Sequence, residues 1–303
     1  MTTSVTTSTT RTAPPARSGR RRPRLTFLGV VPFFAFAFLF LVVPTLYLVV
    51  GSFQHTQGLT TTWTLQNYAD LTRPNIASAY EASIEISLVT ALSSGIFGFV
   101  LAYAIIGGGL PGPMRTLVTT FSGVASNFAG IPLALAFIFT IGRTGFLIVA
   151  LRSIGLDLYG NGFTIYSKIG LEIVYFYFQL PLMILVIAPA IDGLKKEWRE
   201  ASENAGASTV QYWRFVALPV LMPSLLGSMI LLFGNAFGAQ ATAFALTGGF
   251  IRLVTIVIGS QLSGDTLGDK NLGYALAMGM VVIMSVTLLA YSWLTRQAER
   301  WQR

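Results

Sequence analysis

Six long apolar runs dominate this chain and limit what it can fold into. Each run is close to the roughly 20 residues that a helix needs to cross about 30 Å of hydrocarbon. Backbone polar groups must be satisfied within a bilayer, so such runs fold as helices. The predicted spans cover about 28–53, 83–106, 116–141, 169–191, 217–238 and 272–295. The sequence therefore predicts an all-α integral membrane protein with six transmembrane helices.

Composition excludes several other classes of protein. Hydrophobic residues make up 53% of the chain and charged residues only 11%, whereas an average soluble domain carries roughly a quarter charged residues. There is no cysteine and the single histidine is His55, so we expect no disulfide, no metal site and no cofactor. The net charge of +8 comes from basic residues that flank apolar runs. This placement favours contact with membrane lipid over binding of nucleic acid.

The first 24 residues differ from the rest of the chain. Residues 1–24 are rich in Ser, Thr, Pro and Arg and contain no apolar run, which predicts a disordered basic tail. The arginines before the first apolar run are also compatible with a twin-arginine or Sec signal peptide. However, the run 28–53 is longer than the roughly 7–15 residues of a signal h-region. We therefore expect an uncleaved first span.

The basic residues also predict how the chain is oriented, because cytoplasmic loops carry an excess of Lys and Arg. With the N-terminus in the cytoplasm, both termini and the loops 107–115 and 192–216 face inward. The inward pieces then carry 14 basic residues, and the outward pieces carry six: Arg73, Arg143, Arg152, Lys168, Arg252 and Lys270. The sequence therefore predicts that both termini are cytoplasmic.

The inward loop 192–216 is charged but has a helical pattern. Leu194, Trp198, Ala201 and Ala205 recur at helical spacing, which puts them on one face. Gly206 follows this run, at a position where a left-handed C-terminal cap favours glycine. A second short helix is expected from about Ser208 to Arg214. An amphipathic helix that lies in the membrane interface is the alternative interpretation of this pattern.

A spaced set of residues in this loop and the next span is more specific. The set consists of Glu200, Ala201, Ser202, Gly206, Val216, Leu218 and Pro219. It resembles the EAA signature of ABC importer permeases: Glu-Ala-Ala, three residues, Gly, nine residues, Ile, any residue, Leu-Pro. The chain departs from this pattern at Ser202 and Val216. On this resemblance, residues 25–303 form a type I ABC importer transmembrane domain with cytoplasmic coupling helices between spans 4 and 5.

The resemblance implies a function and partners. The coupling helices would dock on a cytoplasmic ABC ATPase dimer, with Glu200 as a charged contact. Ala201 and Ser202 would allow close approach, and Gly206 would allow the bend. Other expected partners are a second permease subunit, identical or different, and an extracytoplasmic solute-binding protein. The implied location is the bacterial inner membrane. The chain contains no G-x-x-x-x-G-K-[ST] motif, so we expect a transport subunit, not an enzyme, with ATP hydrolysed by another chain.

Polar residues inside or near the spans are candidates for a translocation pathway. They are Asn127, Gln179, Asn235 and Gln240. Such groups need internal partners or a water-filled path, so hydrogen bonds between helices are the alternative interpretation. Closer to the predicted outer surface, the spacing of Lys168 and Glu172 predicts an ion pair within one helix.

The substrate is constrained least by the sequence. Overall resemblance favours a polyamine such as spermidine or putrescine, with ferric iron, aminoethylphosphonate, sulfate or a sugar as alternatives. The outward-facing carboxylates are compatible with a cationic solute: Glu81, Glu85, Asp265 and Asp269. An ion-coupled secondary transporter is the alternative function, but the chain shows neither an internal repeat nor a charge in the middle of a span. A membrane-embedded enzyme lacks a convincing catalytic constellation.

Overall fold

The computed structural model describes residues 26–58, 60–108, 110–263 and 268–300. It divides the chain into two compact units, residues 1–47 and residues 48–303. The predicted tail at 1–24 and the acidic residue Asp265 lie outside the described residues.

The boundary between the two units falls within an apolar helix that changes its hydrogen-bond register once. Helix α1 (Thr26–Ala37) continues through a π-helical turn, η1 (Phe38–Val42), into α2 (Val43–Ser52). The Val43 N–H bonds the Phe38 carbonyl. Pro44 follows directly, and its ring cannot sit against the carbonyl four residues earlier in a regular α-helix. The wider π turn accommodates this proline without ending the helix.

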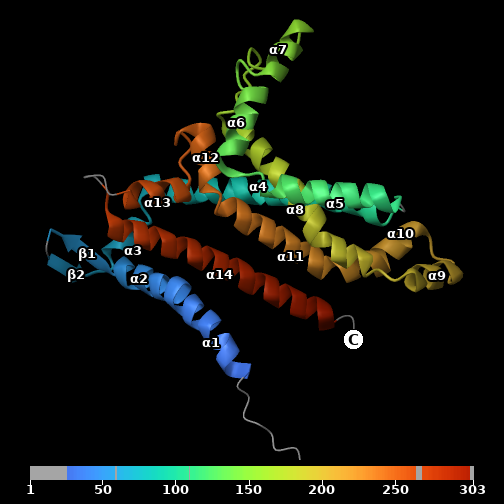
Figure 1. Ribbon diagram of the computed structural model, residues 1–303, viewed down its shortest axis with the longest axis horizontal. Helices are drawn as coiled ribbons and strands as arrows, with labels where there is room; N and C mark the ends of the chain where they lie inside the picture. The colour runs from blue at the N-terminus through green and yellow to red at the C-terminus, as the bar shows by residue number, and fades with distance from the viewer. Residues whose placement is uncertain (1–25, 59, 109, 264–267, 301–303) are drawn as a thin grey trace, which may run out of the picture. The chain divides into compact units, whose positions relative to one another are not determined.

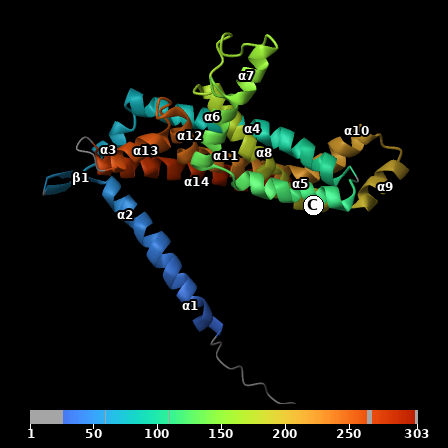
Figure 2. The ribbon, with the colours of Figure 1, turned by 45° about the horizontal axis from the view of Figure 1, so that its top comes forward.

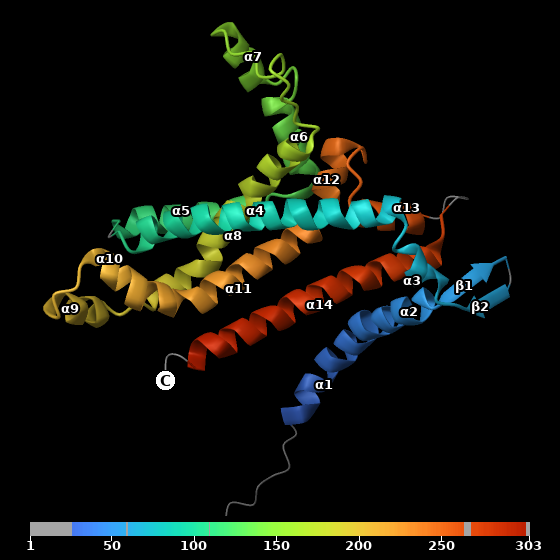
Figure 3. The same cartoon turned by 180° about the vertical axis from the view of Figure 1, so that it is seen from behind.

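Four long helices form the framework of the second unit. They are α4 (Pro74–Ile106), α8 (Lys168–Asp192), α11 (Leu218–Phe237) and α14 (Lys270–Arg300). Helix α4 packs most extensively against α8, while α11 packs against α4, α8 and α14 (Figures 1 and 3). Within the described part of the chain, six helical segments are long and apolar enough to cross a membrane. The prediction of a helical membrane protein with six spans is confirmed.

Two clusters of buried side chains hold these helices together. The larger cluster joins α4, α8 and α11 through residues that include Met183, Ile187, Leu221 and Leu232. The second joins α8 to α6 (Gly130–Ile141) and α12 (Gln240–Thr247), and it includes Leu133, Tyr175, Phe178 and Leu246. Helix α8 contributes to both clusters, so it links the long helices to the α6–α12 pair.

The predicted span 116–141 is wrong as a single helix. The chain forms α5 (Gly112–Asn127) and then α6, with a break at Phe128 and Ala129. Gly130 has a φ of +73°, a conformation that side chains other than glycine seldom adopt. Figure 2 shows α6 turning away from the line of α5. The apolar segment suited to crossing a membrane is instead Gly130–Ser153, which includes α7 (Phe146–Ser153).

Small elements gather at the two ends of α4. Near Pro74 lie the antiparallel hairpin β1 (Gln54–Gln57) and β2 (Thr60–Trp63), α3 (Gln66–Asp70) and α13 (Val254–Leu262). The hairpin was not predicted. The Asn67 side chain anchors it by donating to the Ser52 and Gln54 carbonyls, at 2.9 and 2.7 Å. Near the other end of α4 lie α9 (Lys196–Asn204) and α10 (Thr209–Tyr212) (Figure 1).

Candidate coupling loop and membrane path

The loop 192–216, called the coupling loop below, folds into two short helices separated by a turn. Helix α9 ends at Asn204, and Gly206 adopts a φ of +77°. The expected first helix and its terminating glycine are confirmed. The next helix, α10, begins with a capping box in which Ser208 and Gln211 satisfy each other's backbone N–H groups. The coupling loop is therefore an ordered helix–turn–helix element.

A continuous helix joins the coupling loop to the membrane-spanning helix α11. Helix α10 runs through a π turn, η2 (Trp213–Ala217), directly into α11, and the Leu218 N–H bonds the Trp213 carbonyl. Pro219 lies at the start of α11, so the wider turn accommodates its ring as at Pro44. Leu218 and Pro219 therefore occupy the point where the loop becomes the span. A displacement of α10 would be passed to α11 without an intervening flexible link.

The surface of the coupling loop exposes small and apolar side chains. Ala201 and Ala205 are exposed, as is Glu200 beside them. Val210 and Phe215 are 75% and 68% exposed. On the helical face predicted from the sequence, Leu194 and Trp198 are half-buried, whereas Ala201 and Ala205 are exposed. The rest of the chain therefore covers only part of that face. The uncovered part is a surface that another protein could pack against.

A groove of about 620 Å³ separates α9 from the ends of α4, α5 and α8. Glu200 lines this groove with Tyr103, Arg115 and Tyr212. Arg115 forms an ion pair with Asp192 across the groove. On α9, the Glu203 carboxylate accepts a hydrogen bond from Arg199 at 3.0 Å and raises the pKa of that guanidinium. Glu200 thus lies at a polar edge where α9 meets the helix ends.

The four candidate pathway residues do not form one cluster. Gln179 is fully buried, and its amide donates to the Thr90 hydroxyl on α4 at 3.0 Å. Gln179 therefore makes a hydrogen bond between two helices, as the alternative interpretation expects. It does not line a translocation path in this conformation. Asn127, Asn235 and Gln240 are exposed, at the end of α5, late in α11 and at the start of α12.

Asn127 and Gln240 mark two helix breaks that lie together. The Gly130 N–H, just after the first break, donates to the Thr242 hydroxyl at 2.8 Å. The Tyr175 hydroxyl on α8 donates to the Ala239 carbonyl in the second break at 2.5 Å. Sequence reasoning missed Thr242 and Tyr175. A cluster of Asn, Gly and Pro around residues 127–132 was the signal for the first break.

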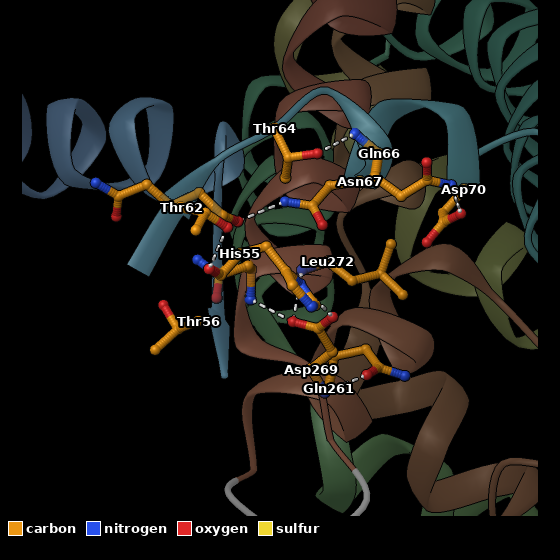
Figure 4. Close-up of polar contacts among 12 residues, drawn as sticks. His55, Thr56, Thr62, Thr64, Gln66, Asn67, Asp70, Gln261, Asp269 and Leu272 are labelled. Atoms are coloured by element: carbon orange, nitrogen blue, oxygen red, sulfur yellow. Dashed lines mark hydrogen bonds and ion pairs between the residues drawn. The ribbon is translucent and has the colours of Figure 1, made fainter. Parts of the chain in front are cut away.

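Two of the three described carboxylates that were expected to face outward are paired. Lys168 forms its ion pair with Glu85 on α4, so the expected Lys168–Glu172 pair is wrong. Asp269 Oδ2 lies 3.8 Å from Nδ1 of His55 (Figure 4). The other oxygen of Asp269 accepts the backbone N–H groups of Asn271 and Leu272 at the start of α14. Glu81 is exposed on α4.

Comparisons with known proteins agree with this architecture. The chain is 24% identical over 230 residues to the sulfate transport system permease protein CysT of Salmonella typhimurium, covering 75% of this chain and 79% of that protein. It is 31% identical over 127 residues to the spermidine/putrescine permease PotB of Haemophilus influenzae, covering 41% and 43%. A bacterial ABC transporter that imports alginate superposes with a TM-score of 0.69 at 18% identity, covering 90% and 95%. No family model matches.

Proposed function

We propose that this chain, a membrane-spanning permease subunit of an ABC importer, carries a small oxyanion of the sulfate class. It is a multi-pass inner-membrane transport protein, and ATP is hydrolysed by separate subunits. The choice of sulfate rests on one observation: the similarity to a sulfate permease extends over three quarters of both chains. This choice replaces the polyamine favoured by the sequence alone.

In this proposal, the ATPase dimer drives transport through the coupling loop. The helix and turn that would dock on the ATPase dimer carry Glu200, Ala201, Ser202 and Gly206. All of these are exposed except Ser202, which is half-buried. Support comes from the continuous path from α10 through η2 into α11. Closure of the ATPase dimer would displace α10, and the helical connection would pass that displacement to α11. The exposed apolar side chains Val210 and Phe215 supply contact area beside the charged edge.

The proposed pathway lies between this chain and a second permease subunit. Asn127, Asn235 and Gln240 are exposed polar groups on segments that neighbour the two helix breaks. Polar groups at membrane depth need a partner or a watery path. A solute delivered by an extracytoplasmic binding protein would enter at the end of α4 that carries α3 and α13, and leave at the end near α9. Both termini would be cytoplasmic.

A direct uptake experiment tests the proposed substrate. The chain is expressed with its ATPase and binding protein in cells that lack their own sulfate and polyamine importers. Accumulation of radiolabelled sulfate, abolished when the chain is omitted, is the expected result. Spermidine uptake without sulfate uptake would contradict the proposal.

Polyamine transport is the second candidate, and a specific observation favours it. The similarity to the spermidine/putrescine permease has the higher identity, 31%, although it covers only 41% of the chain. The same experiment separates the two candidates when labelled spermidine and labelled sulfate are offered in parallel to the same cells.

A further inference from the structure

A cavity of about 340 Å³ opens at the end of α4 that lies opposite the coupling loop. Helix α4 has 33 residues, so the two ends are about 50 Å apart. The cavity lies between the first turn of α4, the segment between α12 and α13, and α13 itself. The residues that matter for its chemistry are Arg73, Asn75, Arg252, Gln261, Ile76 and Leu272.

Hydrogen-bond donors and positive charge characterise this cavity. Arg252 is exposed, and within the described part of the chain it has no carboxylate partner. One guanidinium nitrogen of Arg73 is bound by Asp70 at 2.8 Å, which leaves its other N–H groups for a ligand. The side-chain oxygen of Gln261 (Oε1) accepts a hydrogen bond from the Asp269 backbone N–H at 2.8 Å (Figure 4). That bond leaves the Gln261 NH₂ group as a donor.

The cavity offers a cation few groups to bind. Its described lining residues include two arginines and no carboxylate. Two carboxylates lie next to lining residues. Asp70 pairs with Arg73, and its side chain is only 14% exposed. Asp269 accepts the backbone N–H groups of Asn271 and Leu272 through one oxygen, and its other oxygen lies beside His55. A polyamine would therefore meet positive charge, whereas an oxyanion would meet the donors that it prefers.

The floor of the cavity strengthens these interactions. Ile76 and Leu272 are 4% and 8% exposed, and both belong to the larger buried cluster. Charges interact more strongly beside such apolar side chains than in bulk water, because the local dielectric constant is lower. The volume also exceeds what a small oxyanion needs, since each water takes about 30 Å³ in the liquid. The ligand would therefore keep part of its hydration shell.

We propose that this cavity is a capture site for a small oxyanion, held by Arg252 and Arg73 with Gln261 as a further donor. The inference rests on the proposed function, and it adds a place where the transported anion is held before it enters the membrane path. The site is open and partly hydrated, so its affinity is modest. It retains an anion released nearby and does not replace the binding protein.

Equilibrium binding of radiolabelled sulfate to the purified transporter tests this site. The complete permease–ATPase complex is placed in nanodiscs without the binding protein. Wild type is compared with Arg252→Ala, Arg252→Lys and Arg143→Ala. Arg143 is the matched control, because it is an exposed arginine of another loop, outside the cavity, and has no carboxylate partner among the described residues.

The capture site predicts that Arg252→Ala weakens sulfate binding by about tenfold or more, since it removes charge-assisted hydrogen bonds. Arg252→Lys retains part of the affinity, Arg143→Ala binds as wild type does, and spermidine does not compete. Equal binding by wild type and Arg252→Ala overturns the site. If the wild type transports sulfate in cells but binds none in nanodiscs, the capture site is also overturned. The proposed function stands in that case. A wild type that fails to transport sulfate contradicts the proposed function, and the capture role falls with it.

Discussion

The backbone N–H of Gly130 donates to the hydroxyl of Thr242 across 2.8 Å, and this contact joins two interrupted helices. Gly130 follows the break between α5 and α6, and Thr242 lies in the first turns of α12, just after the break that follows α11. Tyr175 on α8 holds the second break through the Ala239 carbonyl. Each break thus has a side chain from another helix that satisfies a backbone group freed by the interruption.

Removal of the Thr242 hydroxyl is expected to loosen this junction. Thr242→Val preserves the shape of the side chain but leaves the Gly130 N–H without its acceptor, at a cost of about 1–3 kcal/mol. A lower thermal unfolding temperature of the detergent-purified chain is the expected result. Thr247→Val is the matched control, because Thr247 is equally buried on α12 but only donates to the Ala243 carbonyl of its own helix. An equal loss in both variants would contradict a special role for Thr242.

The charge of Glu200 is expected to matter for coupling and not for folding. Glu200→Lys reverses an exposed charge at the edge of the groove beside α9, so insertion and unfolding temperature should stay unchanged. Solute-stimulated ATP hydrolysis and uptake should fall together in proteoliposomes. Glu197→Lys, at an exposed position in the first turn of the same helix, should retain both activities. Normal uptake by Glu200→Lys would remove Glu200 from the coupling contact.

Substitutions of Gly206 are expected to be tolerated according to how readily the new residue adopts a left-handed backbone conformation. A Cβ at this position meets nothing within 4 Å, so the penalty comes from its φ of +77° alone. Gly206→Val should cost about 1–2 kcal/mol and impair uptake. Gly206→Asn should retain more activity, because Asn tolerates this conformation better. Equal uptake by the two variants would show that the turn is not required in this form.

The orientation can be tested cleanly because the chain has no cysteine of its own. Single cysteines replace Glu197 in α9 and Asn161 in the loop before α8, both exposed positions. A membrane-impermeant maleimide added to intact spheroplasts should label Asn161→Cys, and should label Glu197→Cys only after permeabilisation. The reverse pattern would invert the proposed topology.

The ion pair between Lys168 and Glu85 is expected to make a small contribution to stability. Its side chains are 39% and 53% exposed, so the pair contributes about 0.2–1 kcal/mol. Lys168→Glu should lower the unfolding temperature by placing two carboxylates together, and the exchange Glu85→Lys with Lys168→Glu should recover most of the loss. Lys270→Glu serves as a control, because a carboxylate at the start of α14 is favoured by the helix dipole.

Apolar length and local signals explain which parts of the fold could be predicted. The runs around α4, α8, α11 and α14 are long enough that only a helix satisfies their backbone in a membrane. Gly206 is found by its place after a periodic segment. The break at Phe128 and Ala129 is marked only by the local signal of Asn127, Gly130 and Pro132, and a prediction from apolar length alone passes over it in favour of one span.

Tertiary neighbours account for what could not be predicted. Local spacing pairs Lys168 with Glu172, but Glu85 on α4 is the partner in the folded chain. Gln179 finds Thr90 only because α4 and α8 pack together. Arg73 and Arg252 are far apart in sequence and meet at one cavity only after α13 folds back beside the start of α4.

ATP-driven transport in a defined system tests the central claim most directly. The chain, its partner permease where one is needed, and the ATPase are reconstituted in proteoliposomes with the binding protein outside and ATP inside. Sulfate should accumulate with ATP, and it should not accumulate without ATP under an imposed proton or sodium gradient. Accumulation that follows the ion gradient and persists without the ATPase would contradict the account and favour an ion-coupled transporter.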